Sequence, residues 1–316
     1  MSGADQGASA DQAPASSTVA PSVASTASLP PRAAPAAVRV ASGGWRHDVT
    51  GATVVWRREL IRFSRNRLRI LTSLAQPILF LFVLGTGMSS LISRGATSGG
   101  ANFKTFIFPG VVAMTVLFTA TFSAVSIVWD REFGFLREML VAPVRRGALI
   151  AGKCAGGATV ATLQALIMLA FAGLVGVPYS AVLIFTLIGE MLLAAVAITA
   201  LGTALASRIA QVESFQVVLQ FVVLPLFFLS GALFPLHGLP TWLSVLTRLD
   251  PLAYMVDPMR RAVFEHVTKT PVVSQLFGGT MTWGSWHLPI GVELALTAVF
   301  AALMLTVAVR EFSKTD

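Results

Sequence analysis

The sequence predicts an all-α polytopic membrane protein with six transmembrane helices. The chain is 55% hydrophobic, and only 12% of its 316 residues are charged, against about 25% in a typical soluble protein. Its mean hydropathy is +0.75. The apolar residues form continuous runs and do not alternate with polar ones, which favours helices over a β-barrel. The net charge of +8 is spread over the ends of these runs, so we do not expect a nucleic-acid partner.

Residues 1–44 differ in composition from the rest of the chain. They consist mainly of Ala, Ser, Pro, Gly and Thr, and large apolar side chains are rare. Such a segment buries too little surface to offset the entropy lost on ordering, so we predict a disordered tail. It lacks the basic start and apolar stretch of a secretory signal. We therefore expect a cytoplasmic tail at 1–44 and a transmembrane domain at 45–316.

Six windows are long and apolar enough to cross a bilayer as a helix, which takes about 20 residues. The predicted spans are residues 70–91, 107–129, 153–176, 181–206, 215–236 and 288–309. If the N-terminus is cytoplasmic, most of the 23 Lys and Arg residues lie on the cytoplasmic side. The positive-inside rule therefore places both termini in the cytoplasm.

The segment before the first span, residues 53–69, predicts an amphipathic helix. Its apolar and basic residues fall on opposite faces at helical spacing, as in a helix that lies in the membrane interface. The alternative is a helix packed on another cytoplasmic element. The residues assigned to the interfacial helix are Trp56, Arg58, Leu60, Arg62, Phe63 and Arg65.

A charged segment, WDREFGFLREMLVAPVRRG at 129–147, lies between the second and third spans. Asp130 can cap a helix, and Ala142-Pro143 would end it, because the residue before proline avoids helical dihedral angles. The segment also carries exposed apolar side chains such as Phe133, which favours a docking surface. The alternative is an ordinary positively charged cytoplasmic loop.

Three sequence blocks carry a resemblance to a known family. They are DREFG followed by LVAPVRR and GK (130–153), LPLFFLSGALFP (224–235), and LDPLAY (249–254) with Arg260-Arg261. Together they resemble the ABC type-2 exporter permeases, in particular the daunorubicin-resistance and nodulation-factor branch. The resemblance covers roughly residues 50–316.

The resemblance implies that 130–141 is a coupling helix seated on an ATP-binding subunit. The implied docking residues are Asp130, Arg131, Glu132, Phe133, Leu136, Arg137, Glu138 and Met139. Two ATPase copies, which bind the ATP and magnesium, and a second permease would complete the transporter in the bacterial inner membrane. We expect no cofactor in this chain itself. The cargo would be an amphipathic drug-like molecule, lipid or lipid-linked glycan.

One motif nearly matches a phosphate-binding loop. Residues 147–154 read GALIAGKC, but a cysteine replaces the hydroxyl that ligates magnesium, and no strand precedes the motif. We therefore read Gly152, Gly156 and Gly157 as small residues that allow close helix contacts. We expect no ATPase site in this chain, no catalytic residues and no metal site.

The segment 236–288 predicts short outer helices, one at 241–249 and one from Asp250-Pro251 to about residue 267. They are too short to span and too apolar to be free in water, so we expect re-entrant helices. Asp250, Pro251 and Tyr254 are assigned to an outer gate. The alternative is a packed external cap without a gating role.

Glu190 lies in the middle of the fourth span, where a carboxylate costs about 3 kcal/mol or more. It makes a proton-coupled secondary transporter the alternative to an ATP-driven exporter. The residues assigned to a substrate path are Met114, Phe118, Phe122, Glu190, Gln220 and Phe227. For any single one of them, ordinary helix packing is the alternative.

Overall fold

The computed structural model describes residues 44–89, 103–134, 144–236, 238–267, 281–283 and 286–314. All of them belong to one unit, Val40–Asp316. The described residues are almost entirely helical, and their one sheet is a two-stranded hairpin. The all-α polytopic fold class is therefore confirmed. Of the predicted tail, 1–44, all but Gly44 lies outside the described residues, and so do residues 135–141 of the predicted coupling helix, 130–141.

Six helical segments are long and apolar enough to cross a membrane, as predicted. They are Arg67–Ser89, Phe103–Glu132, Arg146–Leu169, Ala181–Ala206, Val212–Leu229 and Ile290–Ser313. In element labels they are α2 (Arg67–Leu79) with the π-helix η1 (Phe80–Leu84), α4 (Phe103–Glu132), α6 (Arg146–Leu169), α7 (Ala181–Ala206), α8 (Val212–Leu229) and α12 (Ile290–Lys314).

Two of these helices end about seven residues earlier than the predicted spans. Helix α6 ends at Leu169 and is followed by the 3₁₀-helix η2 (Ala172–Val175). Gly176 then adopts a φ of 82°. Helix α8 ends at Leu229, and Gly231 follows with a φ of 71°. Gly231 lies two residues after Leu229 and ends α8 with a left-handed conformation that few other residues adopt; Gly176 ends η2 in the same way.

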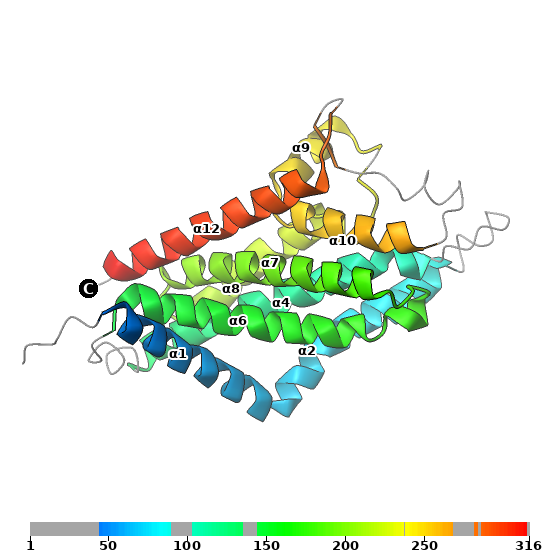
Figure 1. Cartoon of the computed structure of the whole chain (residues 1–316). Coiled ribbons are helices and arrows are strands. Elements are labelled where there is room, and N and C mark those ends of the chain that lie inside the picture. Colours follow the sequence, from blue (N-terminus) through cyan, green and yellow to red (C-terminus); the bar gives the residue numbers. More distant parts are fainter. Residues whose placement is uncertain are drawn as a thin grey trace, which may run out of the picture. The chain divides into compact units, whose positions relative to one another are not determined.

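Helices α4, α6 and α7 pack against one another and form the centre of the bundle (Figure 1). Most of α4 is buried, whereas α2, α8 and α12 are largely exposed. Their exposed side chains are mostly apolar, for example Val83, Phe221 and Val299. Such faces suit contact with lipid tails or with another transmembrane helix.

The predicted role of the α6 glycines is confirmed. A Cβ on Gly152 would meet the backbone of Ala52, and one on Gly156 would lie 2.8 Å from Cβ of Glu59. A Cβ on Gly157 would lie 2.6 Å from Oγ of Ser123. Because these glycines have no side chain, α4 and the helix that precedes the first span can approach α6 closely.

That preceding helix, α1 (Trp45–Arg65), packs along α6 (Figure 1). Val55 and Glu59 are buried in this contact, and Nε1 of half-buried Trp56 donates to Oγ1 of Thr159 at 3.0 Å. The side chain of Trp56 therefore contacts α6. The position of α1 at the membrane surface stays a prediction.

A break at Asn66 separates α1 from α2. Its backbone leaves the helical region, with φ −100° and ψ 71°, and its side chain accepts from N–H of Arg69 at 3.0 Å. Asn66 thus caps α2. Further along, Pro77 lacks an N–H, and the π-helix η1 follows it.

The outer segment forms α9 (Thr241–Leu249), α10 (Ala253–His266) and the strands β1 (Thr282–Trp283) and β2 (Trp286–His287). The two helices lie where the sequence predicts them. The strands pair antiparallel, with Trp283 opposite Trp286. The proposed re-entrant position of these helices stays a prediction.

Candidate functional site

The charged segment at 129–147 begins in the last turns of α4. This helix continues through Glu132, so Asp130 lies inside its last turn and does not cap a new helix as predicted. The reason is a buried cation that holds Asp130 within α4. The predicted docking residues Leu136, Arg137, Glu138 and Met139 lie outside the described residues.

The buried cation is Lys153 of α6. Its Nζ contacts Asp130 of α4 directly and lies 3.6 Å from Glu59 of α1. It also donates to the backbone oxygen of Ser126 at 3.3 Å. The side chains of Lys153, Asp130 and Glu59 are 5%, 5% and 9% exposed. A buried charge is tolerated only when it is paired, so this cluster joins three helices at one point.

Arg131 and Glu132 hold the connection between α7 and α8. Nη1 of Arg131 donates to the carbonyl oxygen of Ser207 at 2.9 Å. A carboxylate oxygen of Glu132 accepts from N–H of Val212 at 2.8 Å. Val212 is the first residue of α8, where a negative charge also favours the helix dipole. Both side chains therefore have contacts within this chain, and their docking role stays a prediction.

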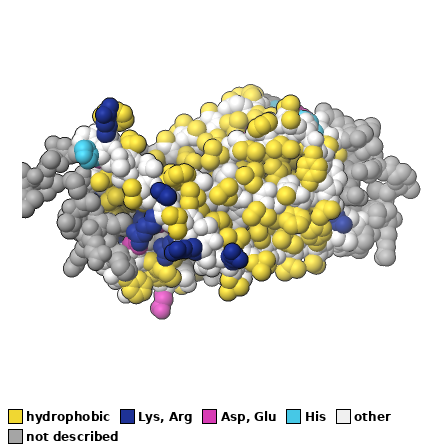
Figure 2. All heavy atoms as spheres, turned by 60° about the horizontal axis from the view of Figure 1, so that its bottom comes forward, with side chains coloured by type: hydrophobic (Ala, Val, Ile, Leu, Met, Phe, Trp, Pro, Cys, Tyr) yellow, Lys and Arg dark blue, Asp and Glu magenta, His cyan; other side chains and the backbone are white. Residues whose placement is uncertain are grey.

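Phe133 differs from these charged neighbours because it is apolar, and yet its side chain is 66% exposed. Its ring contacts Trp129 edge to face, with the centroids 6.3 Å apart. Figure 2 shows that most Lys and Arg side chains on the face in view gather toward one end, whereas hydrophobic side chains cover much of the rest. This pattern fits a charged membrane boundary next to a lipid-facing surface.

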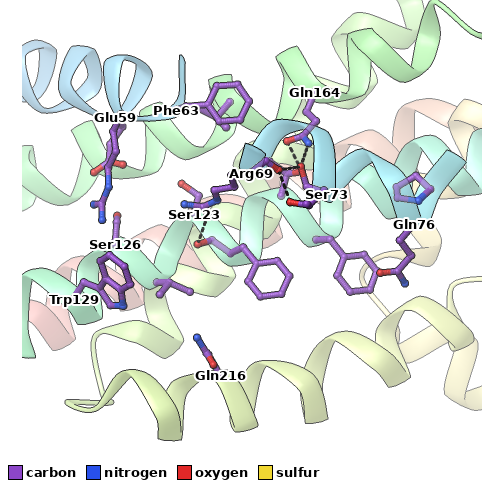
Figure 3. A pocket seen from close by; sticks show the side chains of 18 residues that line it. Glu59, Phe63, Arg69, Ser73, Gln76, Ser123, Ser126, Trp129, Gln164 and Gln216 are labelled. Carbon is purple, nitrogen blue, oxygen red and sulfur yellow. Dashed lines mark hydrogen bonds between the residues drawn. The ribbon is translucent and has the colours of Figure 1, made fainter. Parts of the chain in front are cut away.

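A pocket of about 420 Å³ lies between α1, α2, α4, α6 and α8 (Figure 3). Phe118 and Phe122, two of the predicted path residues, line it with stacked rings 6.4 Å apart. Arg62 and Arg69 line it as well, although the sequence assigned Arg62 to the interfacial helix. The pocket thus combines an aromatic wall with basic side chains.

The other predicted path residues lie elsewhere. Met114 and Phe227 are buried in the core and do not line this pocket, although the Phe227 ring lies 6.5 Å from that of Phe118. Gln220 is exposed on α8. Glu190 is 6% exposed on α7, and its Oε2 has no hydrogen-bond partner in the described part of the chain. Thus the substrate path as predicted is brought together only in part.

A polar bridge forms one wall of the pocket. The buried Gln164 of α6 donates to Ser73 of α2, and its Oε1 accepts from Oγ1 of Thr119 of α4 at 3.0 Å. Arg69 adds a second link, since its Nη2 donates to the carbonyl oxygen of Phe122 at 3.1 Å. Both contacts fix α2 against the bundle.

A second pocket, of about 590 Å³, adjoins the first at the end of α4. Arg62 and Trp129 line both pockets, and the Arg62 guanidinium lies 5.3 Å from the centre of the Trp129 ring. This distance is typical of a cation–π interaction. The second pocket also includes Arg58, Arg65 and Phe133, so it is continuous with the exposed ring at the end of α4.

The predicted outer-gate residues lie at the start of α10. Oδ1 of Asp250 accepts from N–H of Leu252 at 2.9 Å, and Pro251 lies in the turn between them. The Tyr254 hydroxyl donates to the carbonyl oxygen of Arg248 at 2.8 Å and accepts from Nε1 of Trp283 at 3.1 Å. These contacts tie α9, α10 and β1 together; gating itself stays a prediction.

Burial raises the pKa of Asp250 to about 8, although its backbone hydrogen bond to Leu252 acts in the opposite direction. A carboxyl group whose pKa is higher in the folded state stabilises the fold in its protonated form. That contribution is complete below the ordinary pKa of 3.8 and is lost as the pH rises through about 8.

We therefore expect the thermal unfolding temperature to be higher at pH 5 than at pH 9, and this difference to shrink in Asp250→Asn. Circular dichroism in detergent would measure it. Glu213→Gln, which changes an exposed carboxylate on α8, is the control and should keep the wild-type pH dependence. An Asp250→Asn variant with the wild-type dependence would contradict the assignment.

The sequence analysis missed the three buried partners Glu59, Lys153 and Arg260. Glu59 occupies the apolar face of α1 between Trp56 and Phe63, and a carboxylate there signals a buried cation. Arg260 is 2% exposed and donates to the carbonyl oxygen of Gly231. Its guanidinium lies 4.6 Å from the centre of the Phe106 ring, and burial lowers its pKa to about 10. No local pattern distinguishes the buried Arg260 from the adjacent, partly buried Arg261.

Six apolar spans, with a charged end and a pocket between them, define a multi-pass membrane protein of the transporter class. The family model described as ABC-2 type transporter matches residues 50–264, which is more than half of the chain. The chain belongs to the ABC-2 type transporter family. It is a transmembrane permease subunit and not itself the ATPase, and its family membership implies an ABC ATPase partner.

Similar proteins agree with this assignment. Nodulation protein J of Rhizobium leguminosarum bv. trifolii is 29% identical over 215 residues, covering 67% of this chain and 80% of that protein. The ycf38 transport permease of Cyanophora paradoxa is 26% identical over 211 residues, covering 66% and 72%. Nodulation protein J of Rhizobium meliloti (strain 1021) is 29% identical over 209 residues, covering 65% and 78%. The chain is thus an ABC-2 permease of the branch that includes nodulation protein J.

Proposed function

We propose that this chain is the permease subunit of an ATP-driven exporter in the bacterial inner membrane. Two ATPase subunits bind ATP and magnesium, and a second permease, identical or homologous, completes the transporter. Both termini are cytoplasmic. The cargo is an amphipathic molecule such as a drug, a lipid or a lipid-linked glycan, and efflux of an antibiotic would be one form of this activity.

The observation that carries the proposal is the exposed Phe133 at the end of α4, beside the buried cluster of Lys153, Asp130 and Glu59. An exposed aromatic ring surrounded by charged groups is typical of an interface anchor. A displacement of Phe133 would move the end of α4, and the contacts of Lys153 would transmit this movement to α1 and α6. Binding of an ATPase at Phe133 could therefore move helices that line the pocket.

To test docking, we would co-express the chain with an ABC ATPase from the same genome and purify the complex in detergent. Phe133→Asp is expected to lower the amount of co-purified ATPase at least about tenfold, because a charged group replaces an apolar anchor worth about 2 kcal/mol. Membrane insertion should stay unchanged, since the side chain of Phe133 is 66% exposed.

Phe133→Leu is the matched control and should retain most of the ATPase, because it keeps an apolar side chain. Equal amounts of ATPase in the Asp variant and the wild type would contradict docking at this site. Transport by vesicles that hold this chain alone, without ATP and abolished by Glu190→Gln, would instead favour a proton-coupled transporter.

A further inference from the structure

The pocket between α1, α2, α4, α6 and α8 carries an excess of positive charge. Its charged lining residues are Glu59, Arg62 and Arg69. The carboxylate of Glu59 is already paired with the buried Lys153, at 3.6 Å. Within the described ranges, neither Arg62 nor Arg69 has a carboxylate partner. The guanidinium groups of Arg62 and Arg69 can therefore bind an anion.

Within the part of the chain that the structure describes, both guanidinium groups retain donors without a protein partner. Arg62 interacts with the face of the Trp129 ring, and Arg69 uses one nitrogen for the carbonyl oxygen of Phe122. A guanidinium has five N–H donors, which match the oxygens of a phosphate or carboxylate in pairs. The remaining donors of Arg62 and Arg69 would therefore be satisfied by an oxyanion.

The rest of the lining separates into a polar and an apolar part. Ser73, Gln76 and Gln216 offer neutral hydrogen-bonding groups, and Figure 3 shows Gln216 projecting from α8 on the side opposite Arg69 and Ser73. Phe118 and Phe122 supply the stacked aromatic wall. A volume of about 420 Å³ lies in the range of small-molecule sites, about 300–1,000 Å³.

We propose that this pocket binds the anionic group of an amphipathic molecule through Arg62 and Arg69, while Phe118 and Phe122 contact its apolar part. The inference rests on the proposed function, because it names the chemical class of the cargo: an organic anion with a lipid-like or aromatic portion. A cation would meet two guanidinium groups against a single lining carboxylate, that of Glu59, so the charge of the pocket disfavours cations.

The test uses the full chain in phosphatidylcholine nanodiscs and three probes: dodecyl phosphate, dodecyltrimethylammonium and inorganic phosphate. Isothermal titration calorimetry would measure each dissociation constant. The wild type is expected to bind dodecyl phosphate at least about tenfold more tightly than either other probe, because only this probe has both an anion and an apolar chain. Each probe is also titrated into nanodiscs without protein, and this signal is subtracted, so partitioning into lipid does not enter the comparison.

Arg62→Gln and Arg69→Gln are each expected to weaken dodecyl phosphate binding at least about tenfold, the usual cost of losing a charge-assisted contact. Arg69→Lys keeps the charge and should lose less than Arg69→Gln. Arg57→Gln is the matched control, since Arg57 lies on α1, is exposed and does not line the pocket. Its affinity should equal that of the wild type.

Equal affinity for the cationic and anionic amphipaths would overturn the proposal, and so would an equal loss in Arg57→Gln, which would indicate general surface charge. Inorganic phosphate binding as tightly as dodecyl phosphate would overturn it too, because the apolar wall would then contribute nothing. The measurement needs neither ATP nor the ATPase. If anion selectivity is absent while ATPase still co-purifies, only this inference fails, and the proposed function stands.

Discussion

Lys153→Met is expected to destabilise the folded chain by about 3–5 kcal/mol, the cost of leaving buried charges without their partner. Methionine fills similar space on α6 but removes the cation between Asp130 and Glu59. Both carboxylates have side chains less than a tenth exposed. After the substitution Asp130 retains Arg58 at 3.8 Å, which is half exposed and a weaker partner. Equilibrium unfolding in detergent micelles would measure the loss.

Two further variants control this experiment. Arg208→Met breaks the salt bridge to Glu311, in which the Arg208 side chain is 64% exposed, and should cost at most about 1 kcal/mol. Adding Glu59→Gln and Asp130→Asn to Lys153→Met removes the stranded charges and should restore part of the stability. A Lys153→Met variant as stable as Arg208→Met would refute the buried cluster.

Gly110→Ala is expected to destabilise the chain by about 1–3 kcal/mol through overpacking. Gly110 lies inside α4, where alanine normally favours the helix by about 1 kcal/mol. Here, however, the added Cβ would meet the backbone of Ala232, in the turn that follows α8. A backbone group cannot rotate away as a side chain can. Arg260 also binds this turn, at Gly231, so the turn has little room to shift.

Gly189→Ala is the matched control, because Gly189 lies inside α7 and a Cβ there has nothing within 4 Å. It should leave the free energy of unfolding unchanged or raise it slightly. Thermal unfolding of both variants in the same detergent would compare them. Gly110→Ala with the stability of Gly189→Ala would show that α4 and the turn lie further apart than described.

Hydropathy and helical periodicity predicted the six spans, the helix before the first of them and the two outer helices. These signals are local, since each depends on residues within one helix. The end of α8 was misplaced because apolar residues continue beyond Leu229, although the backbone turns at Gly231. The predicted end of the third span, residue 176, coincides with Gly176, where the 3₁₀-helix η2 ends; α6 itself ends earlier, at Leu169. Hydropathy does not report on backbone dihedral angles.

The sequence predicted less of the candidate site than of the fold. Lys153 pairs with Asp130 and Glu59, which are distant in the chain and come together only when three helices pack. The pocket likewise draws its residues from α1, α2, α4, α6 and α8. Phe118 and Phe122 were found because they share one face of one helix. Arg69 was noted only as part of a basic face, since its neighbour Phe122 is 53 positions away.

The break at Asn66 has a mechanical consequence. Helix α1 is fixed to α6 by the glycine contacts and by Lys153, whereas α2 contacts the bundle through the buried side chains of Leu74 and Pro77 and through the Gln164 and Arg69 hydrogen bonds. To admit a bulky cargo, the pocket would widen most readily by an outward rotation of α2 relative to α1. The backbone at Asn66 would be the hinge of this rotation, and the Gln164–Ser73 hydrogen bond would have to break.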